Sequence, residues 1–106
     1  MMAAIYRGTT PTFKLTPTGY NVSQLGTPSL VISQDMVFIS LDDEIVVDTV
    51  NNCVKAKLPV EESVRLVPGL TASIQLLFDD GTSAVAFAPH EFEVLESLVE
   101  TVLPED

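Results

Sequence analysis

The chain has 106 residues, a formal net charge of −10 at pH 7 and a single cysteine, Cys53. A chain of this length forms one domain, here taken as residues 1–106. A lone cysteine excludes an internal disulfide and favours a reducing compartment or a virion over secretion. The acidic balance argues against nucleic-acid binding, and without a basic leader or an apolar run of about 18 residues we expect neither a signal peptide nor a membrane span.

The first predicted strand is RGTTPTFKL at residues 7–15, where Phe13 and Leu15 point to one face and polar side chains point to the other. Pro11 and Pro17 bracket its ordered part, and because proline cannot donate to a ladder, we expect the strand to lie at a sheet edge or to end at both prolines. The next residues, 18–28, contain two glycines and a proline and are expected to form a loop.

Residues 29–41 predict two strands separated at Gln34-Asp35. A hairpin over residues 44–58 follows, with a turn at Asn51-Asn52. Pairing Val50 with Cys53 in this hairpin puts its apolar residues on one face and sets an aspartate opposite a lysine on the other. The segment that follows is expected to cross over with one helical turn at residues 61–64.

The strongest local signal is the hairpin around Asp80-Gly81, which joins two alternating apolar runs within residues 70–88. A two-residue turn there sets Phe78 opposite Ser83, so that the large side chains of both strands share one face. A three-residue loop would instead turn the aromatic and branched residues of the second strand away from those of the first.

The last residues follow helical spacing, and we expect a short amphipathic helix over residues 94–103. Together these elements predict an all-β protein, an immunoglobulin-like antiparallel β-sandwich with a short C-terminal helix. The helix carries an apolar stripe that docks either on its own domain or on a partner, and it is the predicted interface: Val94, Leu95, Leu98, Val99 and Val102.

Several polar residues are candidates for catalysis or metal binding. His90 has no neighbouring nucleophile and acid, and Cys53 has no basic neighbour except a lysine two residues away, so neither pattern indicates catalysis. The cluster Asp42-Asp43-Glu44 lacks the calcium-loop spacing, and the pair Glu91 and Glu93 lacks the cleft that a glycosidase needs. We therefore predict no enzyme activity, no metal and no cofactor.

Four stretches in this order resemble a known family: RGTTPTFKL at the start, VISQ at 31–34, LPVEESVRLVPG at 58–69 and ASIQLLFDDGTSAVA at 72–86. The chain is similar to small structural proteins of phages and prophages of Gram-positive gut bacteria. It is more distantly similar to the N-terminal domain of phage upper baseplate proteins. It departs from the family pattern at Pro59, where a threonine or serine is expected.

The resemblance implies a β-sandwich module of the virion or of its assembly, associated with the tail or baseplate. Its expected partners are other virion proteins or further copies of itself, and its expected location is the virion or the host bacterial cytoplasm during assembly. Two other functions fit the composition: a small acidic inhibitor that mimics the charge of DNA, and a carbohydrate-binding sandwich in which Tyr6 and Tyr20 stack on sugars.

Overall fold

A computed structural model of the chain describes residues 3–96. Within this range the chain is mainly β-structure with short helical connections. The strands are β1 (Ala3–Tyr6), β2 (Thr12–Leu15), β3 (Thr27–Gln34), β4 (Val37–Ser40), β5 (Ile45–Asp48), β6 (Cys53–Lys57), β7 (Thr71–Asp79), β8 (Ala84–Ala86) and β9 (His90–Leu95). The helical segments are η1 (Val22–Gln24), η2 (Asp42–Glu44) and α1 (Val60–Ser63).

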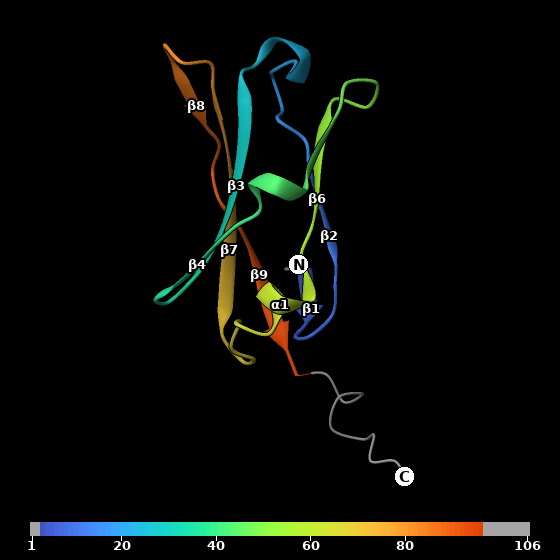
Figure 1. Cartoon of the computed structure of the whole chain (residues 1–106), viewed down its shortest axis with the longest axis vertical. Helices are drawn as coiled ribbons and strands as arrows, with labels where there is room; N and C mark the ends of the chain where they lie inside the picture. Colours follow the sequence, from blue (N-terminus) through green and yellow to red (C-terminus); the bar gives the residue numbers. More distant parts are fainter. Residues whose placement is uncertain (1–2, 97–106) are drawn as a thin grey trace.

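The strands form two sheets that face each other (Figure 1). The first sheet has the order β1-β9-β7-β3-β4, with β8 also paired to β7, and the second has the order β2-β6-β5. The expected all-β, sandwich-like architecture is therefore confirmed. So is the expected edge position of β2, which pairs only with β6.

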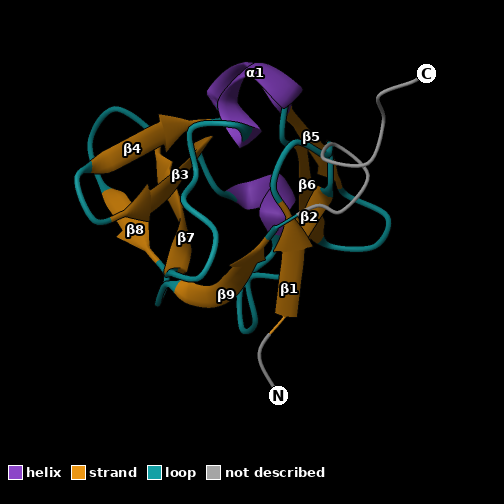
Figure 2. Ribbon diagram, turned by 90° about the horizontal axis from the view of Figure 1, so that it is seen from below, coloured by secondary structure: helices purple, strands orange, loops and turns teal. Residues whose placement is uncertain are grey.

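One pair of neighbouring strands is parallel, which corrects the expectation of a wholly antiparallel fold. β1 runs parallel to β9, with Ala3 beside Phe92 and Tyr6 beside Leu95. The sequence pattern does not predict β1, because a four-residue run with two alanines shows little alternation. Seen from below, β9 and β1 carry the first sheet round toward β2 of the second, while α1 lies across the opposite side (Figure 2).

The core lies between the sheets and follows the alternation of the strands. Most strand residues predicted to point inward are buried or half-buried, as shown by Leu30 and Ile32, which both have 0% exposure. Val47 is an exception, because it has 39% exposure on β5, the edge strand of the second sheet. Connections contribute as well, because Val22 and Leu66 close the ends of the core. The fully buried side chains include Phe78, Leu30, Ile32, Ile39, Leu41, Leu58, Leu66, Leu76, Val54 and Val94.

The central hairpin has the predicted faces but a different register. Phe78 lies opposite Val85, not Ser83, so the loop has four residues, 80–83. The Asp80 carboxylate holds this loop by accepting the backbone N–H groups of Thr82 and Ser83 at 2.9 and 2.8 Å. An Asx-type turn therefore replaces the expected two-residue turn.

The second hairpin differs from expectation in the same way. Cys53 lies opposite Asp48 rather than Val50, and the four residues between them form the loop. The Asp48 carboxylate accepts the backbone N–H groups of Val50 and Asn51, both at 3.1 Å. It also meets Lys55 at 3.5 Å, so the predicted opposite-charge contact exists as a diagonal rather than a direct cross-strand pair.

Strands β8 and β9 lie end to end along the same edge of β7, with an extra residue between them. Phe78 faces Val85 and Ile74 faces His90, so four steps along β7 correspond to five along the partner. This bulge explains why the inward residues have odd numbers before Pro89 and even numbers after it.

The C-terminal prediction needs a correction at its start. Val94 and Leu95 belong to β9, so no helix begins at Val94. Val94 has 1% exposure and lies in the core of its own domain, because it continues the inward face that Phe92 begins. The rest of the predicted helix lies outside the described residues.

The crossover between the two hairpins contains the expected helical turn, α1, and it is held by a buried glutamine. Gln34, with 2% exposure, donates from Nε2 to the carbonyls of Val67 and Leu70 at 2.9 and 3.1 Å. Its Oε1 accepts the N–H of Val67 at 2.7 Å. This one side chain therefore satisfies the backbone groups of Val67 and Leu70, while the intervening Gly69 donates its N–H to the carbonyl of Val94 on β9 at 2.8 Å.

Candidate functional site

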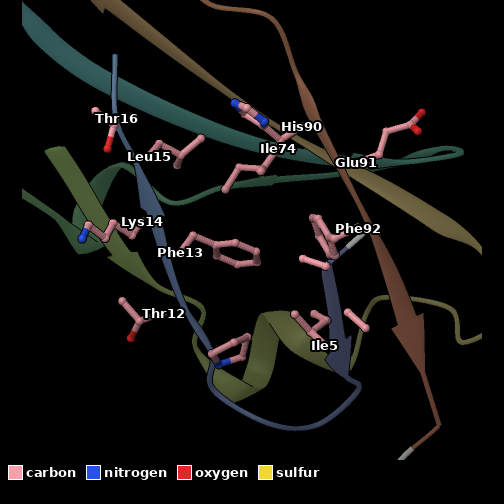
Figure 3. A pocket seen from close by; sticks show the side chains of 13 residues that line it. Ile5, Thr12, Phe13, Lys14, Leu15, Thr16, Ile74, His90, Glu91 and Phe92 are labelled. Carbon is pink, nitrogen blue, oxygen red and sulfur yellow. The ribbon is translucent and has the colours of Figure 1, made fainter. Parts of the chain in front are cut away.

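A groove of about 560 Å³ lies where the first sheet approaches the edge strand of the second (Figure 3). One wall is formed by β1 and β9 of the first sheet, and the other wall is formed by β2, the edge strand of the second sheet. The residues that line it are Ala3, Ala4, Ile5, Pro11, Thr12, Phe13, Lys14, Leu15, Thr16, Ile74, His90, Glu91 and Phe92.

The floor of the groove is apolar. The rings of Phe13 and Phe92 point toward each other, with centroids 5.2 Å apart and planes inclined by 50° (Figure 3). Phe92 and Ile74 are buried, whereas Phe13 is half-buried, so its ring offers apolar surface to an incoming group. Such a floor favours the side chains of a protein or an apolar ligand over a highly charged one.

Backbone edges, not only side chains, face this groove. Every residue from 11 to 16 lines the groove. Because neighbouring residues of a strand point their side chains to opposite faces, the side chains of one face alone could not give this continuous lining, so β2 presents its backbone edge to the groove. Leu58 donates to the carbonyl of Pro11 at 2.9 Å, and the antiparallel alternation from that pair directs the N–H and C=O groups of Thr12 and Lys14 away from β6.

The wall formed by β1 also presents unpaired backbone groups to the groove, at one residue. Arg7 donates its N–H to the carbonyl of Leu95 at 2.9 Å, so the parallel alternation turns the peptide groups of Ala4 away from β9. The next outward carbonyl, that of Tyr6, accepts hydrogen bonds from Thr9. The groove therefore lies between two strand edges that can each pair with one more strand.

The groove was not predicted from the sequence, and the predicted interface is not brought together there. Among the five predicted interface residues, Val94 is buried, Leu95 is half-buried beside Tyr6, and Leu98, Val99 and Val102 lie outside the described residues. The proline-bracketed strand around Phe13 was the one available signal, because it marked an unpaired sheet edge.

The candidate catalytic and metal-binding residues lie in separate parts of the fold. His90 is exposed at the rim of the groove, Cys53 is buried, and Asp42 accepts the backbone N–H of Leu30 at 3.1 Å. Over residues 3–96, no group of three or more histidine, cysteine, aspartate or glutamate side chains is arranged to hold a metal ion. In the same part of the chain, no helix is long and apolar enough to cross a membrane.

The carboxylates with shifted pKa values belong to turns rather than to the groove. Backbone N–H donation from Ser83 and Thr82 lowers the pKa of Asp80 to about 2. Hydrogen bonds from the Asn51 side chain and backbone lower the pKa of Asp48, with a smaller contribution from Lys55. In both turns the hydrogen bonds favour the charged carboxylate, which gives Asp48 and Asp80 a structural role as turn caps.

The two exposed tyrosines considered for sugar stacking lie on different elements. Tyr6 is on β1, and Tyr20 precedes η1, where its ring packs edge-on against Phe87 with centroids 5.2 Å apart. The Tyr20 ring therefore packs on Phe87, and no ring contact joins it to Tyr6 among the described residues. Comparison with known proteins adds no identification, because no family model and no curated protein matches this chain.

Proposed function

We propose that this chain is a non-catalytic structural or assembly module of a tailed phage, associated with the tail or baseplate, and that it acts by binding an extended segment of another virion protein. The observation that carries the proposal is the groove between β1 and β2. It combines unpaired strand edges with an apolar floor, which are the two features that strand addition requires.

In this mode the partner's backbone pairs with the edge groups of Thr12 and Lys14 on one side and of Ala4 on the other. Alternate side chains of the partner then point down onto Phe13 and Phe92. Main-chain hydrogen bonds supply affinity, and the apolar floor selects large apolar side chains.

The resemblance of the four sequence stretches supports the phage context, and the two facing sheets support an immunoglobulin-like classification of the sandwich. The virion, or the host bacterial cytoplasm during assembly, is the location that this role requires. The acidic inhibitor and the sugar-binding sandwich have no arrangement of residues in their favour that compares with the groove.

The test uses particles produced from the prophage that carries this gene. We expect mass spectrometry to detect the chain in purified particles or tail assembly intermediates. Thr12→Pro removes one outward N–H from the groove, and we expect it to abolish incorporation while the isolated protein keeps its melting temperature. Thr10→Pro, in the loop before the strand, is the matched control. Absence of the wild-type chain from particles and intermediates would contradict the phage role, whereas normal incorporation of Thr12→Pro would contradict the groove mode.

A further inference from the structure

All three lysines of this strongly acidic chain lie on the outer face of the second sheet. We call Lys14 of β2 with Lys55 and Lys57 of β6 the lysine face. Lys14 lies directly opposite Lys55 in the cross-strand register, and Thr12 lies opposite Lys57.

This arrangement does not stabilise the isolated domain. Like charges directly opposite each other in a sheet are destabilising. Asp48 compensates Lys55 at 3.5 Å, but Lys14 and Lys57 form no ion pair with any residue in the range 3–96. Lys14 therefore lies opposite a like charge, and both Lys14 and Lys57 lack an acidic partner among the described residues.

An acidic counterpart lies on the outer face of the first sheet. Glu91 and Glu93 are both exposed on β9, and neither has an ion pair in the part of the chain that the structure describes. Their neighbours across the strands are small: Ala4 and Thr71 beside Glu93, and Ser73 beside Glu91. We call Glu91, Glu93 and these three neighbours the acidic face.

The two faces match in spacing as well as in charge. Lys55 and Lys57 are two residues apart on one strand, and so are Glu91 and Glu93, which gives each pair a separation of about 6.6 Å along its strand. The faces cannot meet within one molecule. Lys14 and Glu91 point away from each other, on either side of the Phe13 and Phe92 rings (Figure 3).

We propose that the lysine face of one copy of this chain binds the acidic face of a second copy. The contact is heterologous, so in a pair one copy keeps a free acidic face and the other keeps a free lysine face, and the association continues as a ring or an open stack. It goes beyond the proposed function, because it uses the outer faces of the sheets and not the floor of the groove.

The test is a charge exchange between the faces. Lys14→Glu with Lys57→Glu makes the lysine face acidic, and Glu91→Lys with Glu93→Lys makes the acidic face basic. We expect size-exclusion chromatography with light scattering to show concentration-dependent association of the wild type and loss of association in each variant alone. Mixing the two variants restores opposite charges at both contacts, so we expect the mixture to associate again.

A control variant, Asp43→Lys with Glu61→Lys, makes the same change in net charge as Glu91→Lys with Glu93→Lys, at two exposed positions outside both faces. We expect it to associate like the wild type. Thermal melts check folding, and if either double variant unfolds, the single changes Lys57→Glu and Glu93→Lys replace it. A monomeric wild type at millimolar concentration, or a mixture of variants that stays monomeric, would overturn the proposal. Binding of the lysine face only to a polyanion such as heparin would overturn it as well.

Discussion

Phe13 on β2 and Phe92 on β9 join the two sheets across the groove, with ring centroids 5.2 Å apart. We expect Phe92→Ala to lower the free energy of unfolding by about 3–5 kcal/mol, because the ring is 2% exposed and its loss leaves a cavity. Phe13→Ala should cost less, since its ring is only half-buried. Urea denaturation of both single variants and the double variant should give a coupling of about 0.5–1.5 kcal/mol. Strict additivity would show that the ring contact contributes nothing of its own.

The two faces of β7 should differ sharply in their tolerance of charge. Ile74 is 3% exposed and faces the core, so Ile74→Asp buries an unpaired carboxylate and should unfold the protein at room temperature. Gln75 is exposed and donates one hydrogen bond to the carbonyl of Phe87 at 2.9 Å. Gln75→Asp should therefore cost no more than about 1 kcal/mol. Circular dichroism melts of the two variants check this, and similar melting temperatures would be incompatible with the strand faces described here.

The amide of Gln34 should be indispensable to the crossover that follows α1. Gln34→Leu keeps the approximate volume of the side chain but leaves the backbone groups of Val67 and Leu70 without their partners, at about 1–3 kcal/mol for each unsatisfied group. We expect a large drop in melting temperature and faster hydrogen exchange over residues 66–70.

The matched control for this change is Gln24→Leu, because Gln24 is exposed at the end of η1. This control should leave both the melting temperature and the exchange rates close to those of the wild type. If Gln34→Leu behaves like the control, water or a rearranged loop satisfies these groups and the buried amide is not required.

The turn at Asp80 should make the protein sensitive to acid. Its pKa is lowered to about 2 in the folded state from an ordinary value of 3.8, so the ionised carboxylate stabilises the fold above pH 4 and this contribution disappears as the pH falls toward 2. Asp80→Ala removes the cap at every pH. We expect the difference in melting temperature between the wild type and this variant to be constant from pH 7 to about pH 5 and to shrink between pH 4 and pH 2.

Asp35 is the control for the acid experiment, because this exposed aspartate lies at a different turn and its side chain has no hydrogen bond among the described residues. Asp35→Asn keeps a residue that tolerates the positive φ of 53° at this position. This variant leaves the Asp80 cap intact and should therefore keep the acid sensitivity of the wild type. A pH-independent difference for Asp80→Ala would mean that the cap does not depend on charge.

The sequence alone determined most of the strand residues that point into the core, although Val47 on the edge strand β5 is exposed. Alternation placed Leu30 and Ile32 inward, and it placed Ile74, Leu76 and Phe78 on one face. It also located both main hairpins, the short helical turn and the edge strand around Phe13. These features depend on residues that are neighbours in the chain, so a local pattern is enough to predict them.

The registers were decided by contacts that alternation cannot detect. In both hairpins the predicted pairing was displaced by two residues, and a shift of two returns every side chain to the same face. The apolar pattern is therefore equally satisfied by either register. The carboxylates of Asp48 and Asp80 determine which register forms, because they accept hydrogen bonds from backbone N–H groups and so stabilise four-residue loops.

The groove, the lysine face and the acidic face belong wholly to the tertiary structure. β1 finds its place beside β9 although nearly the whole described chain separates them, and only this parallel pairing puts Ala4 across the groove from Thr12. Lys14 meets Lys55 for a similar reason, because β2 pairs with a strand about forty residues later. Residue spacing within one segment carries no information on such pairings, since they depend on how separate strands bury their apolar faces together.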